Sequence, residues 1–338
     1  MPIAAPRPET WIRTTPGGLY CEPGDFYIDP LRPALRAVIT HGHGDHARPG
    51  NARVLATAGT IAIMQARYGE EAGGALQALA YGETLAIGGV QVRLAPAGHV
   101  LGSAQIVLDY RGSRVVVSGD YKRRPDPTCA PFEPLHCDLF ITEATFGLPV
   151  FRHPPDNQEI DKLLHSLLLF PERCHLVGVY ALGKCQRVLA LLRQAGYVEP
   201  VYLDGALIGL TELYEHLGVP LGPVLPAVGV AREALRGRIV LAPPSAMADV
   251  WSRRLPDPRV ALASGWMRVR QRAKANGVEL PLVISDHADW DELTATLDDV
   301  AADEIWVTHG REEALVHYAT KKGYRARALA LIGFEEDE

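Results

Sequence analysis

The densest group of reactive side chains lies between residues 39 and 49, in the sequence ITHGHGDHARP. Four side chains that can bind metal occur within six residues there, directly after a short apolar run: His41, His43, Asp45 and His46. Imidazole and carboxylate groups are ligands of zinc, and also of manganese and iron. Together with candidate ligands further along the chain, they exceed the four that one tetrahedral ion binds, which predicts two ions.

Two glycines separate these side chains. Because they lack a Cβ, we expect Gly42 and Gly44 to permit tight turns that let the ligands of one loop converge. The segment is also compatible with a solvated surface loop, since short motifs produce false matches. Its place directly after a strand-like run favours a site, because loops carried by such strands often hold catalytic residues.

Further along the chain, polar residues end one apolar run after another. The residues in these positions are Asp29, His99, Asp120, Glu143, His287 and His309. Asp29 precedes a proline, where an aspartate is usually a turn residue, but it could also orient a metal-bound imidazole. A single carboxylate at a strand end is commonly a cap, whereas a series of such residues indicates one edge of a sheet that carries a site.

The elements expected to position these residues change in kind near residue 150. Before it, short strands and turns dominate, with one helix expected over 58–68. After it, helices over 156–169 and 184–194 alternate with strands at 175–180, 200–203, 238–242 and 259–263, which is typical of a parallel α/β unit. Residues 217–226 are expected to form a loop. Strands ending in polar residues return at 280–284 and 304–307.

The composition is that of an ordinary globular protein, with 47% hydrophobic and 22% charged residues. The five cysteines include no CxxC pair, which argues against a disulfide framework or a thiolate zinc site. No apolar run is long enough to cross a membrane, and the first residues lack the apolar core of a signal peptide, so we expect a cytoplasmic protein. The net charge is −6, but acidic residues concentrate in 286–304 and 335–338, so the remainder is basic enough to bind phosphates locally.

With these residues laid out in order, the chain resembles the β-CASP group of nucleases with the metallo-β-lactamase fold. This group includes ribonuclease J, the cleavage and polyadenylation endonuclease and Artemis. Its first four motifs correspond to Asp29, THGHGDH, His99 and Asp120, and its motifs A, B and C correspond to Glu143, His287 and His309. The chain length, the opening Gly18-Leu19-Tyr20-Cys21 and the segment HARPG are most similar to the bacterial DNA-ligase-associated exonucleases.

The resemblance implies an α/β fold, a four-layer αββα metallo-β-lactamase sandwich with an inserted α/β β-CASP domain. The sandwich would comprise residues 1–150 and 266–338, and the β-CASP domain residues 151–265.

The resemblance also assigns the roles of the site residues. One metal ion would be bound by His41, His43 and His99, a second by Asp45, His46 and His309, and Asp120 would bind both. Zinc is the expected ion and manganese the alternative. Hydrolysis of a phosphodiester by a hydroxide activated between two ions follows, with Asp45 counted among the catalytic residues. His287 would be the general acid, held protonated by Glu143.

Phosphates of the substrate would contact three residues outside the motifs. These are Lys184 at the start of a helix, Ser264 at a strand end and Arg268. By resemblance, DNA is favoured over RNA, and a repair DNA ligase or helicase is the expected partner, with no membrane involved.

Three other interpretations stay open. The histidine at motif C is more similar to RNA-processing members, so the chain could be an RNA-processing endonuclease or exonuclease. A small-molecule hydrolase of the lactamase fold is disfavoured because a small substrate does not need the inserted α/β segment. A scaffold with an inactive site is disfavoured because no metal ligand is missing from the motifs.

Overall fold

The structure is a computed structural model that describes residues 5–275 and 277–329. It divides into two compact units, unit 1 with residues 5–149 and 287–329, and unit 2 with residues 150–286. The expected end of the inserted domain was residue 265. In the structure β17 (Leu280–Leu282) pairs in parallel with β16 (Arg259–Ala263), and residues up to 286 therefore stay with unit 2.

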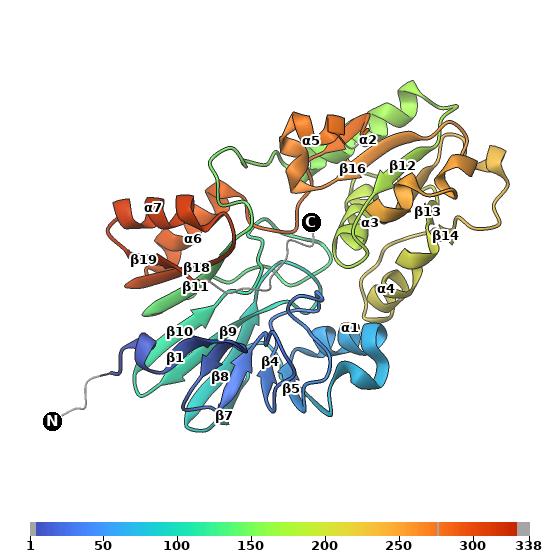
Figure 1. The fold of residues 1–338 in the computed structure, drawn as a ribbon. Helices are drawn as coiled ribbons and strands as arrows, with labels where there is room; N and C mark the ends of the chain where they lie inside the picture. Colours follow the sequence, from blue (N-terminus) through green and yellow to red (C-terminus); the bar gives the residue numbers. More distant parts are fainter. Residues whose placement is uncertain (1–4, 276, 330–338) are drawn as a thin grey trace. The chain divides into compact units, whose positions relative to one another are not determined.

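Unit 1 contains two mixed sheets (Figure 1). The first has the order β1-β2-β3-β4-β5-β6, with β1 (Ile12–Thr15), β2 (Gly18–Cys21), β3 (Phe26–Ile28), β4 (Ala37–Val38), β5 (Arg53–Ala56) and β6 (Ala75–Ala78). The second has the order β19-β18-β11-β10-β9-β8-β7, with β7 (Thr84–Ile87), β8 (Val90–Pro96), β9 (Ala104–Tyr110), β10 (Ser113–Val117), β11 (Leu139–Ala144), β18 (Glu304–Gly310) and β19 (Arg325–Ala328). The second sheet therefore takes strands from both ends of the chain.

Apolar side chains cover both sheets of unit 1. One core cluster combines residues of both sheets, for example Leu19 and Val38 of the first with Ile106 and Leu139 of the second. Helix α1 (Ala58–Tyr68) packs on β4 and β5, and helices α6 (Trp290–Val300) and α7 (Glu312–Lys321) pack on the second sheet. β11 is buried along its whole length, because a strand covered on both faces has no exposed side.

Unit 2 is built on one sheet of parallel strands with the order β14-β13-β15-β12-β16-β17. The remaining strands are β12 (His175–Gly178), β13 (Val201–Leu203), β14 (Val224–Pro226) and β15 (Ile239–Ala242), and the helices are α2 (Asp156–Leu169), α3 (Lys184–Gln194), α4 (Gly205–His216) and α5 (Arg270–Ala275). Strand β14 lies in the segment expected to be a loop, so that prediction was wrong for its last residues. Pro226 is compatible with β14 because β14 is an edge strand, where a missing N–H costs little.

In the described part of the chain, no helix is both long enough and apolar enough to span a membrane.

Candidate metal centre

The loop that follows β4 carries the first group of candidate ligands. It continues from the buried Ile39 and Thr40 into His41, whose side chain is fully buried. Arg67 of α1 donates to the carbonyl oxygen of Gly42 over 2.7 Å and holds the loop against the helix. Neither Gly42 nor Gly44 has a positive φ, so their backbone conformation alone does not require glycine. The missing Cβ that was expected to matter does so at Gly42 through space, since a Cβ there would lie 2.5 Å from Cγ2 of Ile63.

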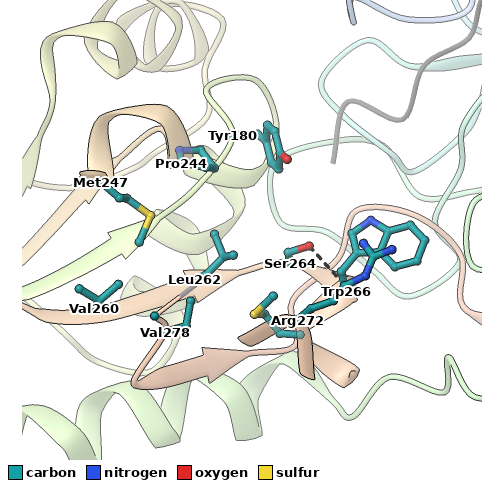
Figure 2. A pocket seen from close by; sticks show the side chains of 11 residues that line it. Tyr180, Pro244, Met247, Val260, Leu262, Ser264, Trp266, Arg272 and Val278 are labelled. Atoms are coloured by element: carbon teal, nitrogen blue, oxygen red, sulfur yellow. Dashed lines mark hydrogen bonds between the residues drawn. The ribbon is translucent and has the colours of Figure 1, made fainter. Parts of the chain in front are cut away.

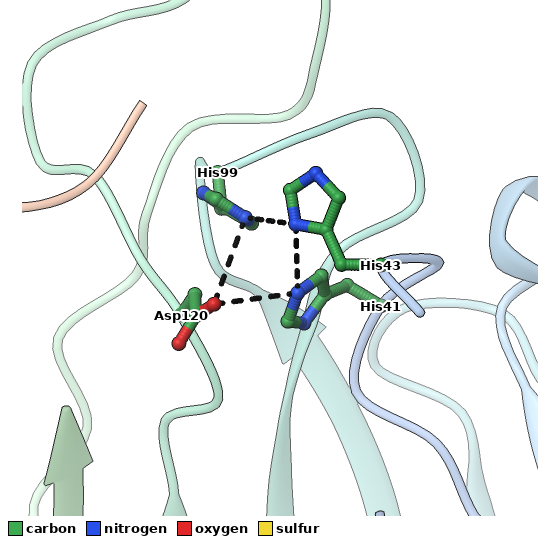
Figure 3. A group of neighbouring side chains, drawn as sticks. All are labelled: His41, His43, His99 and Asp120. Atoms are coloured by element: carbon green, nitrogen blue, oxygen red, sulfur yellow. Dashed lines mark hydrogen bonds and ion pairs between the residues drawn. The ribbon is translucent and has the colours of Figure 1, made fainter. Parts of the chain in front are cut away.

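Three histidines and one aspartate from three separate segments converge at this loop (Figure 3). Nδ1 of His43 lies 3.1 Å from Nε2 of His41 and 3.0 Å from Nε2 of His99. Oδ2 of Asp120 lies 3.4 Å from Nε2 of His41 and 3.9 Å from Nε2 of His99. The structure thus brings the four residues predicted around the first ion to within contact of one another.

A second group shares Asp120. His46, Asp120 and His309 each present one ligand atom, and these atoms lie within 4.8 Å of one another. Nε2 of His46 is 3.4 Å from Oδ2 of Asp120 and also 3.4 Å from Oδ2 of Asp45. Nδ1 of His309 is 3.8 Å from Oδ1 of Asp120. Asp120 therefore lies between the two groups, as a residue that binds two ions would.

Two backbone features bring distant segments to this point. Gly98 has a positive φ, and a Cβ there would lie 2.2 Å from the carbonyl oxygen of Lys122, so only glycine lets the His99 loop lie against the Asp120 segment. The pairing of β11 with β18 shifts register between Thr142 and Ala144, and His309 adopts a left-handed φ of 59° beside this irregularity. Such a bulge re-aims a side chain at the end of a strand.

Asp29 anchors His46 from behind. Its Oδ2 lies 2.8 Å from Nδ1 of His46, and its two oxygens accept hydrogen bonds from N and Oγ1 of Thr40 over 2.8 and 2.6 Å. Because Asp29 holds Nδ1, the other ring nitrogen of His46 faces Asp120. Oγ1 of Thr40 also lies 3.0 Å from Nδ1 of His41. Thr40 was not among the residues predicted from the sequence, although its hydroxyl group directly before the histidines could have indicated a supporting role.

Burial and neighbouring charges set the protonation of this group. Burial, and then the neighbouring His46, hold the pKa of His41 well below its usual value. Burial likewise lowers the pKa of His309 to about 4. Burial would raise the pKa of Asp120, but the nearby histidines, His46 first, outweigh it and keep that pKa well below its usual range. Neutral imidazoles and an ionised carboxylate are the forms that bind metals, and His41, His309 and Asp120 are in these forms. His46 differs: burial would lower its pKa, but Asp45 and then Asp120 outweigh burial and raise that pKa well above its usual value.

The donor set fits divalent metal ions. Ligand atoms that surround zinc at about 2.0–2.2 Å in a tetrahedron lie roughly 3.3–3.6 Å from one another. The contacts among His41, His43, His99 and Asp120 range from 3.0 to 3.9 Å. Imidazole nitrogens and carboxylate oxygens at this spacing, buried together without thiolates, are suited to zinc and acceptable to manganese.

Glu143 and His287 form a further buried pair next to the ligands. Nδ1 of His287 lies 3.0 Å from Oε2 of Glu143 and 3.4 Å from Oγ1 of Thr145. The backbone N–H of Tyr121 donates to Oε1 of Glu143 over 2.7 Å, so the carboxylate is fixed at both oxygens. The His287 ring lies 4.6 Å, centre to centre, from the His99 ring.

The three residues predicted to contact phosphates lie in unit 2, each in a different setting. Lys184 begins α3 but is buried, and its Nζ donates to Oδ1 of Asp286 over 2.7 Å. Ser264 is also buried, and its Oγ accepts a hydrogen bond from the backbone N–H of Trp266. Arg268 is exposed. Their contact with a substrate stays a prediction, and the ion pair of Lys184 gives that side chain a structural partner already.

Several known proteins are similar in sequence to this chain. No family model matches it. A probable DNA ligase of Opitutus terrae is 30% identical over 322 residues, which are 92% of this chain and 30% of that protein. Ribonuclease TTHA0252 of Thermus thermophilus is 30% identical over 227 residues, 57% of this chain and 51% of that protein. An uncharacterized protein in the lig 3′ region of Acidianus ambivalens is 33% identical over 147 residues, 42% of this chain and 99% of that protein.

A solved structure supports the fold. The crystal structure of a protein of unknown function from Enterococcus faecalis has a TM-score of 0.53 with 14% identity, and the match covers 88% of this chain and 80% of that one. The chain spans about a third of the ligase-named relative and half of the ribonuclease. With the order of its motifs, these similarities show that the chain belongs to the β-CASP group of metallo-β-lactamase-fold nucleases.

Proposed function

We propose that this protein is a metal-dependent nuclease that hydrolyses phosphodiester bonds of DNA, working as an exonuclease in DNA repair. The observation that carries the proposal is the buried convergence of imidazoles and carboxylates on both sides of Asp120. Burying so many polar groups against one another costs free energy and does not stabilise a protein core. A hydrolase needs such groups to bind the metal ions that stabilise the charge of its transition state.

Two divalent ions complete the proposed site, zinc by ligand preference or manganese. His41, His43 and His99 would hold one, Asp45, His46 and His309 the other, and Asp120 both. When bound, such ions lower the pKa of a water to about 7 and neutralise charge on the phosphate. The proposal includes the four-layer αββα arrangement of unit 1, which is supported by the apolar clusters on the faces of its sheets.

The chain itself supplies the proton transfers. Asp45 is partly exposed beside His46 and would accept the proton of the attacking water. Glu143 accepts a hydrogen bond from Nδ1–H of His287, which leaves Nε2–H of that ring to protonate the departing oxygen. Because the backbone N–H of Tyr121 fixes Glu143 in turn, the His287 ring is held in one orientation before substrate arrives.

DNA is proposed as the substrate because two relatives point to a ligase. The Opitutus relative that matches nearly the whole chain is named a probable DNA ligase, and the Acidianus relative is described by its position beside lig. A nuclease that prepares DNA ends for joining would work together with such an enzyme, and a DNA ligase is accordingly the proposed partner, with a helicase as a further one.

RNA processing is the second candidate. The observation in its favour is the Thermus relative, which is named a ribonuclease and matches 57% of this chain. His309 at motif C is also similar to the RNA-processing members.

Matched end-labelled strands test the proposal. Single-stranded DNA and RNA of one sequence would be incubated with protein and zinc or manganese, beside an Asp120→Asn control. We expect DNA to be shortened from one end and the control to be inactive. Preferential loss of RNA would transfer the protein to RNA processing, and the absence of cleavage of both strands with either metal would contradict a nuclease.

A further inference from the structure

A separate cavity lies in unit 2 and is lined by residues of that unit alone. Its volume is about 380 Å³. Figure 2 shows the side chains around it, among them Tyr180, Met247, Leu262, Ser264, Arg272 and Val278. This volume is near the lower end of the range of pockets that bind small ligands, so it suits one ring system and not a row of them.

The cavity lies where the parallel sheet of unit 2 would be expected to bind a ligand. Tyr180, Pro244 and Ser264 follow the carboxyl ends of β12, β15 and β16. β12 and β16 are neighbours in the sheet. After β12 the chain continues to β13, toward one edge of the sheet, and after β16 it continues to β17, at the opposite edge. In open parallel sheets, ligands bind outside the carboxyl ends of strands at such a point of divergence.

The lining combines apolar walls with one cation. Met247, Leu262 and Val278 supply flexible or aliphatic surface, and Figure 2 shows Met247 at the end opposite Trp266 and Arg272. The guanidinium carbon of Arg272 lies 4.0 Å from the centre of the Trp266 ring, and the Phe151 ring lies 5.0 Å from Trp266, centre to centre and nearly perpendicular. Arg272 is exposed, and no carboxylate of the described residues lies within salt-bridge distance of it.

From these features we infer that the cavity binds a single nucleotide, with its planar base between the apolar walls and its phosphate at Arg272. An aliphatic ligand would not use the cation, and inorganic phosphate would not use the apolar walls. Aromatic and thioether groups provide a sequence-tolerant surface for a base, and arginine is the preferred partner of phosphate. The inference rests on the proposed function for the source of the nucleotide, which would be one unit of a bound strand.

The inference is tested by combining two changes: removal of one base from the strand, and a substitution that fills the cavity. Binding of a short single-stranded DNA, and of the same strand with one abasic position, would be measured by fluorescence anisotropy in EDTA, where no strand is cut. Val278→Trp fills the cavity, and Val228→Trp makes the same change at a valine of unit 2 that is 69% exposed and outside this cavity. Scanning the abasic position along the strand locates the unit that enters the cavity.

For the wild type and for Val228→Trp, we expect one abasic position to weaken binding about tenfold. For Val278→Trp, the intact strand should bind about tenfold more weakly, and the abasic change should cost nothing further. Arg272→Ala, which leaves the walls in place, should weaken binding and reduce its salt dependence, whereas Lys274→Ala on the same helix should keep the full abasic penalty. An abasic penalty that is equal in Val278→Trp and in the wild type at every position scanned would overturn the inference.

Competition with a free deoxynucleoside monophosphate distinguishes a nucleotide of a bound strand from a free nucleotide as the ligand of the cavity. Displacement of the strand by the monophosphate from the wild type, but not from Val278→Trp, means that the cavity also accepts a free nucleotide. If wild-type protein binds no strand at all, the proposed function fails together with the inference. If it binds and cleaves strands without any dependence on the cavity, the inference fails alone.

Discussion

Asp29 is the residue that links the buried ligands to the first sheet of unit 1. It holds Nδ1 of His46 at 2.8 Å while both its oxygens accept hydrogen bonds from Thr40. Asp29→Asn keeps the shape of the side chain but loses the charge, and we expect metal affinity to fall about 10–100-fold. Competition with a chromophoric chelator measures this affinity. Asp25→Asn, at an exposed carboxylate of the same segment, is the matched control, and equal affinity of the two variants would contradict the role of Asp29.

His287 is expected to act on the leaving group, and that role has its own signature. For a nucleic acid, whose leaving oxygen needs a proton, His287→Ala should reduce the cleavage rate about 10²–10⁴-fold. A p-nitrophenyl phosphodiester releases a stable anion, so its hydrolysis should fall by less than about threefold. His165→Ala, at an exposed histidine of α2, should change neither rate. Equal losses for both substrates would mean that His287 does not donate the proton.

Among single residues, the sequence indicated the candidate ligands and the supporting Asp29, but not the roles of Thr40 or the partner of Lys184. Four ligands occur within one loop, so type and spacing alone indicate a metal site. Thr40 bonds Asp29 across a separation of eleven residues, and Lys184 bonds Asp286 across 102. Such pairs depend on which segments meet after folding, and a lysine at a helix start looks exposed in sequence although it is buried in the fold.

Among the elements, α6 shows how one carboxylate can join a helix to a loop. Glu292 accepts hydrogen bonds from Nζ of Lys122 at 3.1 Å, from the N–H groups of Arg123 and Arg124, and from the N–H of Asp289 in a capping box. Glu292→Gln leaves the buried Lys122 without its counter-charge, and we expect the free energy of unfolding to fall by about 3 kcal/mol. Urea denaturation at pH 7 measures it. Glu22→Gln, at an exposed ion pair with Arg13, should cost less than about 1 kcal/mol.

The same carboxylate should also have a pH signature. Burial would raise the pKa of Glu292, but Lys122 and then Arg124 outweigh it, so this pKa is lower in the folded protein. Its contribution is therefore present above the ordinary glutamate pKa of about 4.3 and is lost as the pH falls through the folded value. The stability difference between wild type and Glu292→Gln should shrink below about pH 4, and a difference that is constant down to pH 3 would contradict the assignment.

Regular elements were predicted where periodicity was strong. The expected helices at 58–68 and 156–169 agree with α1 and α2 at every residue. No bounds were derived for α4, whose glycines at 205 and 209 lower helix propensity, or for α6, whose acidic residues conceal the pattern. The capping box Asp289 to Glu292 was the available signal for α6. Tertiary packing decides such helices more than propensity does.

At the scale of the whole molecule, the candidate ligands come from the two ends of the chain. Unit 1 gathers its site from residues 29–46, 99, 120 and 309, while unit 2 has a core cluster and a sheet of its own. The sequence indicated two parts because short strands and turns give way to alternating helices and strands near residue 150. The assignment of 266–286 to unit 2 depends on the pairing of β17 with β16, and such pairing is set by long-range contacts.

Metal loading should therefore stabilise unit 1 selectively. A ligand that binds only the folded form slows the openings of the segments that hold it. On addition of zinc or manganese, we expect amide hydrogen exchange to slow at residues 39–46, 97–103, 118–122 and 306–310, and a chelator should reverse this. Exchange in β12 and β15 of unit 2 should stay within about twofold of its metal-free rate. Asp120→Asn removes the ligand common to both groups and should abolish the protection. Protection of equal size in both units would show that the metal acts on the whole molecule and not on the candidate centre.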